Sequence, residues 1–209
     1  LAGRPHQTME SWNVSLDWIE RLAPEHVSVD RLEVDEDSRL GLEILQGGSR
    51  YGAAEVPDED ASADFYEIAV RRLRSMGIER YEISNFARPG FESKHNLKYW
   101  TLQPYAGFGA DAHSFDGQMR RSNPESVSDY LENRSEASEF PARPDQERLF
   151  TGLRLDQGIE LSDDEWTRYG AALLRFEECG LVKRDGCHVR LTDRGVLLSS
   201  EVFQEFVGA

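Results

Sequence analysis

One short stretch near the middle of the chain combines side chains that can bind a metal with side chains that can hold a flat ligand. Residues 95–115, HNLKYWTLQPYAGFGADAHSF, contain two of the five histidines of the chain. If the start of this stretch is helical, His95 and Tyr99 share one face and Asn96 and Trp100 the next. If it is extended, its residues alternate between two faces. Either conformation keeps an imidazole and two aromatic rings on one small surface.

These residue types are suited to a haem site. Imidazole is a common axial ligand of haem iron, and aromatic faces pack well against a flat macrocycle. The alternative is an aromatic core with a hydrogen-bonded histidine, and composition alone favours that alternative.

The same stretch contains GFGADA at 107–112, which fits the spacing of a dinucleotide-binding turn. That fingerprint also needs a strand before it and a helix after it. Here Pro104 precedes it closely, and the sequence HSFDG that follows is typical of a turn. A glycine-lined strand that approaches a ligand is the better interpretation.

The N-terminal part of the chain alternates between strand and helix patterns. Thr8 is a candidate cap for a helix over 9–22, whose expected buried face consists of Trp12, Leu16, Ile19 and Leu22. Strand patterns at 26–34 and 78–84 flank a helix over 58–76 that ends at Gly77. This order predicts a parallel α/β sheet or barrel over residues 1–140.

The C-terminal part has a different pattern. A polar, proline-containing break at 117–145 places the domain boundary near 140. Beyond it we expect helices over 145–155, 162–180 and 196–207 and a hairpin at Asp185-Gly186. Helices followed by a hairpin predict a small winged-helix-like domain over residues 141–209.

Composition limits the classes of function. The 209 residues carry a net charge of −15 with a sequence pI near 4.8, and a phosphate backbone would repel such a surface. Residues 145–209 hold eight basic and thirteen acidic residues, so structural or protein-docking use is favoured over a DNA-binding regulator. No apolar run has membrane-spanning length and no signal segment opens the chain. The two cysteines, Cys179 and Cys187, favour a reducing, cytoplasmic setting.

Four motifs together resemble the HemW family. They are LEVDEDSRL, YEISNFARPG, HNLKYW and GFGADAHS, in the family's order, and the resemblance runs from about residue 3 to the end. This family consists of radical S-adenosylmethionine relatives of the oxygen-independent coproporphyrinogen III oxidase. The resemblance implies a partial, TIM-like α/β barrel with a [4Fe–4S] cluster, followed by the winged-helix-like domain.

Individual positions carry this resemblance. GRPHQT is similar to the family's GLPGQT, with Arg4 and His6 in place of leucine and glycine. Gln7 and Ala87 match residues that contact S-adenosylmethionine in the related oxidase. Asp111 replaces a usual glycine.

The resemblance also implies a cargo. HemW-like proteins are regarded as chaperones that bind haem and pass it to acceptor proteins, and their HNxxYW pattern is implicated in that binding. His95 is then the candidate axial ligand of haem iron, Tyr99 and Trp100 the pocket walls, and Asn96 an orienting group. The alternative function is that of the oxidase, which decarboxylates porphyrinogen propionates; the sequence assigns no catalytic residue to it.

The cysteine motif that holds the family's cluster is absent. The family carries CxxxCxxC near its N-terminus, and this chain has no such motif. We therefore expect a truncated piece that cannot by itself assemble the cluster or cleave S-adenosylmethionine.

Overall fold

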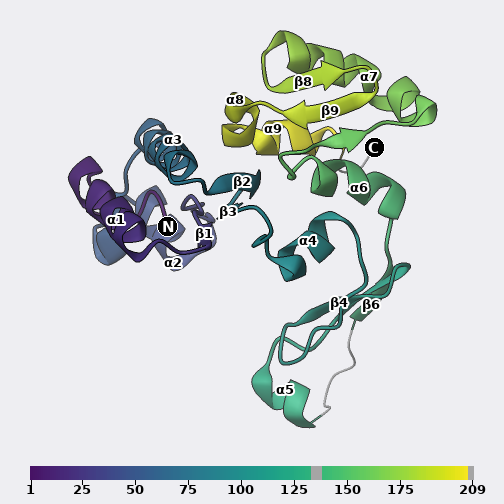
Figure 1. The fold of residues 1–209 in the computed structure, drawn as a ribbon. Helices are drawn as coiled ribbons and strands as arrows, with labels where there is room; N and C mark the ends of the chain where they lie inside the picture. The colour runs from purple at the N-terminus through teal and green to yellow at the C-terminus, as the bar shows by residue number, and fades with distance from the viewer. Residues whose placement is uncertain (133–137, 207–209) are drawn as a thin grey trace. The chain divides into compact units, whose positions relative to one another are not determined.

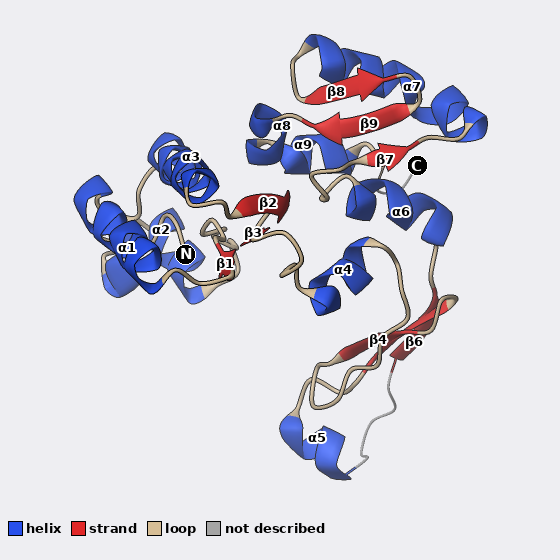
Figure 2. Cartoon of the chain, viewed as in Figure 1, coloured by secondary structure: helices blue, strands red, loops and turns tan. Residues whose placement is uncertain are grey.

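The structure is a computed structural model, and it describes residues 1–132 and 138–206 (Figure 1). The chain forms two compact units, Leu1–Glu92 and Ser93–Ala209, which are described separately below. Both mix helices with small sheets (Figure 2), which confirms the α/β class. No closed barrel is present among the described residues. The domain boundary near residue 140 stays a prediction.

The first unit contains one sheet in the order β1-β3-β2, with His26 opposite Ala87. Both of its strand pairs are antiparallel, so the predicted parallel pairing is wrong for this sheet. Ala2 forms a parallel bridge with Arg31 beside this sheet. The elements of this unit are α1 Met9–Leu22, β1 His26–Ser28, α2 Arg39–Leu45, the 3-10 helix η1 Arg50–Glu55, α3 Glu59–Ser75, β2 Glu79–Glu82 and β3 Asn85–Ala87.

Helix α1 begins where the sequence predicted. Thr8 and Ser11 form a capping box, and Trp12 and Leu16 are buried. The indole N–H of Trp12 donates to the carbonyl of Phe65 on α3, 2.7 Å away. The predicted burial of Leu22 is wrong, because this residue in the last turn is 72% exposed.

Helix α3 follows its predicted pattern closely. The Asp58 side chain caps it by accepting the Ala61 N–H at 2.8 Å. Phe65 and Leu73 are buried on its inner face, and Gly77 after the helix has φ +74°, a left-handed conformation that glycine adopts without strain.

The second unit has two antiparallel three-stranded sheets, ordered β4-β5-β6 and β7-β9-β8. Its elements are α4 Lys94–Trp100, β4 His113–Phe115, β5 Met119–Ser122, α5 Val127–Glu132, β6 Ser138–Pro141, α6 Pro144–Gly152, β7 Ile159–Glu160, α7 Asp163–Glu178, β8 Val182–Asp185, β9 His188–Leu191, α8 Asp193–Leu197 and α9 Ser199–Gln204.

Two expectations for this unit need correction. The predicted polar break at 117–145 contains β5, α5 and β6. Strand β6 was not predicted because all four of its residues are exposed and show no alternating apolar pattern. Within this range, residues 133–137 lie outside the described residues. The helix predicted over 196–207 is two short helices, because Thr192 starts α8 early and Leu198, at φ −113° and ψ 30°, interrupts the turn. Position 207 lies outside the described residues.

The predicted winged-helix-like part is present. Ser162 and Glu165 form the capping box of α7, and Gly180 closes this helix with φ +71°. The hairpin of β8 and β9 is present and turns at Gly186 and Cys187, one residue later than the predicted Asp185-Gly186. Within the described ranges, no helix combines the length and the apolar character that crossing a membrane requires.

Candidate functional site

Helix α4 carries the motif HNLKYW, so the helical alternative is the correct one. The Ser93 hydroxyl caps the helix by accepting the Asn96 N–H at 3.3 Å. His95 and Tyr99 share one face: the Tyr99 hydroxyl lies 2.9 Å from Nε2 of His95, and the rings meet edge to face at 5.0 Å. His95 is exposed, and its imidazole is therefore accessible from solvent.

The remaining rings form an aromatic cluster consisting of Tyr99, Trp100, Tyr105 and Phe115. Tyr99 contacts Tyr105 at a centroid distance of 4.5 Å, and Tyr105 contacts Phe115 at 6.3 Å. Tyr105 and Phe115 also exchange backbone hydrogen bonds of 2.8 and 2.9 Å. The cluster thus joins α4 to β4.

A cavity of about 170 Å³ lies within this cluster. It is lined by Tyr99, Trp100, Leu102, Tyr105, Phe115, Arg120 and Thr151. His95 and Asn96 are not in its lining. Ligand pockets usually measure about 300–1,000 Å³, so this cavity fits a substituent and not a whole macrocycle.

Arg120 on β5 supplies the positive charge of the cavity. Its Nη1 donates to the Tyr105 hydroxyl at 3.1 Å, and its guanidinium lies 4.7 Å from the Phe115 ring centre. Its Nε and Nη2 donate to Glu147 on α6. The hydrogen bond to Glu147 raises the pKa of Arg120.

Glu147 is the anionic side of this ion pair. Burial by itself would raise the pKa of Glu147, but hydrogen bonds from Arg120 and from the backbone N–H of Arg143 outweigh that effect and lower it. The pair therefore stays ionised at neutral pH and links β5 to α6.

Trp100 is held against a second arginine. The guanidinium of Arg154 lies 4.2 Å from the Trp100 ring centre. The indole Nε1 is buried, and within the part of the chain that the structure describes it has no hydrogen-bond partner. A buried donor without an acceptor is costly.

In GFGADA, Gly107 leaves room for a nearby segment of the chain's own backbone. A Cβ on Gly107 would lie 2.2 Å from the carbonyl oxygen of His113. Asp111, which replaces the family's glycine, has φ +60°. A strand and not a helix follows, so the context of the dinucleotide fingerprint is absent.

Gln7 and Ala87 lie in the first unit. The Gln7 carboxamide oxygen accepts the N–H groups of Gly3 and Arg4 at 2.6 and 3.2 Å, and its nitrogen donates to a backbone carbonyl at 3.3 Å. Gln7 thus organises its own loop. Ala87 is 3% exposed in the central strand β3. Contact of both residues with S-adenosylmethionine stays a prediction.

His6 belongs to the same loop. It occupies the position of the family's glycine and has φ +60°. Glycine would adopt this left-handed backbone with less strain than His6 does.

The residues of this chain do not fit an iron–sulfur cluster. Such clusters take four cysteine thiolates, whereas this chain has Cys179 and Cys187, both exposed. Among the described residues, no group of three His, Cys, Asp or Glu side chains is placed to hold a metal.

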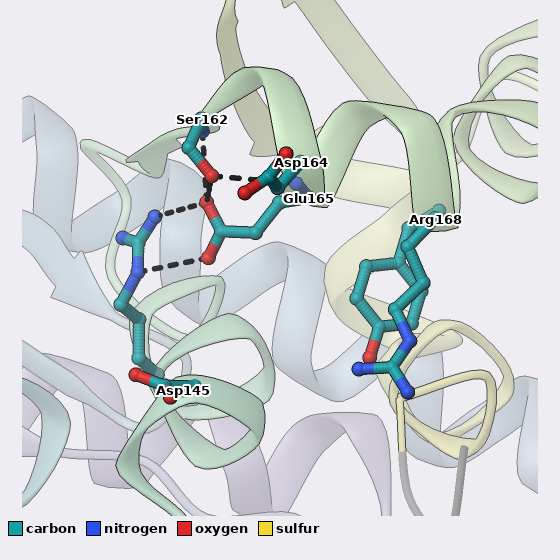
Figure 3. A pocket seen from close by; sticks show the side chains of 7 residues that line it. Asp145, Ser162, Asp164, Glu165 and Arg168 are labelled. Carbon is teal, nitrogen blue, oxygen red and sulfur yellow. Dashed lines mark hydrogen bonds and ion pairs between the residues drawn. The ribbon is translucent and has the colours of Figure 1, made fainter.

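A larger pocket of about 420 Å³ lies between α6 and α7 (Figure 3). Glu165 lies at its centre and binds the Ser162 hydroxyl at 2.8 Å and Nη2 of Arg148 at 2.7 Å. Asp145, Asp164 and Arg168 line its rim. None of the predicted site residues lies here, and the central groups already join the two helices to each other.

Comparisons with known proteins concern the fold and the sequence of the chain. Residues 146–198 match the family described as HemN C-terminal domain. The coproporphyrinogen III oxidase HemN of Escherichia coli, a radical SAM enzyme, superposes with a TM-score of 0.72 at 19% identity, covering 99% of this chain and 53% of the enzyme. At that identity the likeness concerns the fold.

Sequence relatives are more specific. The haem chaperone HemW of Bacillus subtilis is 34% identical over all of this chain and 58% of its own length. HemW of Lactococcus lactis is 30% identical over 97% of this chain and 56% of its own. The mitochondrial radical S-adenosyl methionine domain-containing protein 1 of Bos taurus is 34% identical over 54% of this chain.

The fold matches that of the radical SAM enzyme HemN, and residues 146–198 match its C-terminal domain. The chain is HemW-like in sequence, at 34% and 30% identity to two HemW proteins. It spans a little more than half the length of the HemW proteins it matches.

The sequence predicted site residues on α4 but not most of the residues that surround them. Tyr105 and Phe115 were present in the opening stretch and their aromatic character was a usable signal. Arg120, Glu147 and Arg154 carry no local signal, because only tertiary contacts bring them to the cluster.

Proposed function

We propose that this protein binds haem at His95 and passes it to acceptor proteins. The observation that carries the proposal is the exposed His95 imidazole on α4, paired with Tyr99 beside the aromatic cluster. An accessible imidazole next to flat apolar rings supplies an axial ligand and a packing surface together. Similarity to two haem chaperones supports the same assignment.

The local charge of α4 supports an anionic cargo. Lys94 and Lys98 lie on this helix, and no acidic residue does. They are two of only three lysines in a chain of net charge −15. Haem carries two propionates, and a locally cationic helix on an acidic protein attracts such a ligand.

Haem binding through Nε2 of His95 replaces one hydrogen bond. The Tyr99 hydroxyl occupies that nitrogen at 2.9 Å, and both groups are at the surface. A hydrogen bond of this kind contributes only about 1 kcal/mol, so an iron–imidazole bond displaces it readily. Asn96 lies one residue along the helix and is proposed to orient the ligand.

Haem titration tests the assignment. We expect His95→Ala to change the Soret spectrum of the haem-loaded protein, because the axial ligand is lost. His113→Ala is the matched control, since His113 is also exposed and lies in the same unit. A spectrum unchanged by His95→Ala, or changed equally by both substitutions, removes His95 from the role.

Transfer needs its own measurement. Haem-loaded protein mixed with an apo-acceptor should lose its Soret signature as the acceptor gains one. The same proposal includes three further expectations. A cluster-bearing segment gates the transfer step, the protein is cytoplasmic, and nucleic acid is not among its partners.

The second candidate function is coproporphyrinogen III oxidation, favoured by the structural match to HemN. The discriminating experiment is product analysis on a full-length protein with a reductant. Conversion of coproporphyrinogen III to protoporphyrinogen would overturn the chaperone assignment.

A further inference from the structure

We propose that the cavity inside the aromatic cluster binds a carboxylate on a short alkyl arm, namely a propionate of the haem held at His95. This inference rests on the proposed function and adds to it a subsite that distinguishes acidic from neutral macrocycles. The lining contains one guanidinium, that of Arg120, and no carboxylate. Glu147, the ion-pair partner of Arg120, lies outside the lining.

The cavity is rich in hydrogen-bond donors. Trp100 lines the cavity, and its Nε1 is buried without an acceptor among the described residues. The Tyr105 hydroxyl accepts from Arg120 at 3.1 Å, which leaves its own proton to donate. Arg120 uses three of its five N–H groups on Tyr105 and Glu147. Thr151 already donates to the Glu147 carbonyl.

A carboxylate satisfies these donors best. Its two oxygens accept several hydrogen bonds at once, and hydrogen bonds to a charged acceptor are the strong ones. The apolar walls from Leu102 and Phe115 suit the methylene groups of an alkyl arm. The volume of about 170 Å³ accommodates the arm and not the ring that carries it.

Tyr99 connects the subsite to the iron ligand. One tyrosine both lines the cavity and contacts the His95 imidazole, at a centroid distance of 5.0 Å. A ligand bound through iron at His95 therefore needs to extend only past this one ring to place a substituent in the cavity.

The main experiment compares haem with haem dimethyl ester, whose propionates are neutral. Affinities are measured by Soret titration on the wild-type protein and on Trp100→Phe. We expect the wild type to prefer the diacid by at least about tenfold, the effect of one hydrogen bond to a charged group. Trp100→Phe should lower that preference at least about threefold. Equal affinities in the wild type, or an unchanged ratio in the variant, would overturn the proposal.

Two further variants make this result specific. Trp166→Phe is the matched control. The guanidinium of Arg184 lies 5.1 Å from the Trp166 ring centre, but Trp166 is on α7 and does not line the cavity. Its diacid preference should equal that of the wild type. Tyr105→Phe keeps the ring and removes one donor, so it should lower the preference even if Trp100→Phe folds poorly.

A measurement without haem separates this proposal from the proposed function. In ¹⁵N-labelled wild-type protein, the Trp100 indole N–H resonance should shift on titration with propionate and stay unchanged with propionamide. No shift with propionate, or equal shifts with both, contradicts the carboxylate site. If the shift occurs but His95→Ala leaves the Soret spectrum unchanged, haem ligation by His95 fails and the subsite stands.

Discussion

Helices α4 and α7 of the second unit differ in the contacts that stabilise them. Helix α7 has 16 residues, a capping box and four buried residues. Helix α4 has seven residues, one capping hydrogen bond and no buried residue. Helix α7 is stabilised by the apolar face that it buries, whereas α4 depends on ring contacts with its neighbours.

This difference indicates that the two helices have different roles. Isolated helices shorter than about 12 residues are marginal in water, and segments with few buried contacts open locally at low cost. Helix α4 is therefore the part of the unit that a ligand can order, and the part built around α7 is the scaffold. The contrast predicts different consequences for substitutions in the two regions.

The largest effect is expected in the core beneath α7. Leu173 is 2% exposed, and Leu173→Ala should lower the free energy of unfolding by about 2–5 kcal/mol through lost burial and a cavity. Urea denaturation measures this change. Leu174→Ala, at the adjacent position with 42% exposure, should change it by less than about 0.5 kcal/mol. Similar losses for both leucines would contradict the scaffold assignment.

A smaller effect is expected at the Arg120–Glu147 ion pair between β5 and α6. Glu147→Gln should cost about 1–2 kcal/mol at pH 7, because Arg120 loses its charged partner. Since the pKa of Glu147 in the folded protein lies below the ordinary 4.5, this stabilisation is complete above that value and is lost as the pH falls through the folded pKa. The difference between wild type and variant should therefore close in strong acid.

The control for this ion pair lies on the same sheet. Glu139 and Arg121 form an exposed pair at 3.7 Å, and Glu139→Gln should change stability by less than about 0.5 kcal/mol. Denaturant titrations across a pH series give both values. A pH-independent gap for Glu147→Gln would show that the charge of Glu147 contributes nothing.

The smallest effects distinguish the two helix caps. Ser162→Ala removes the capping box of α7 and should cost about 1 kcal/mol of global stability. Ser93→Ala should leave global unfolding within about 0.5 kcal/mol and instead speed amide exchange within α4. Equal global losses, with no local change in exchange, would erase the distinction between the regions.

Local signals predicted most of the elements correctly. Thr8 caps its helix where expected, and Gly77 follows the end of the helix predicted over 58–76. These features are set by a few consecutive residues, so they can be read from sequence. Strand β6 was missed because its four exposed residues show no alternating apolar pattern. The burial of Leu22 was predicted wrongly because helical spacing does not tell whether other side chains cover the last turn of the helix.

The sequence by itself determined the HNLKYW motif, its place next to an aromatic-rich segment, and kinship with HemW. Those properties follow from residue types and their order along the chain. Only the tertiary structure decided that α4 is a helix with an exposed imidazole, and that a donor-lined cavity with Arg120 lies behind Tyr99. The physical reason is that this cavity is formed by side chains from separate elements, and their meeting depends on packing that no local pattern encodes.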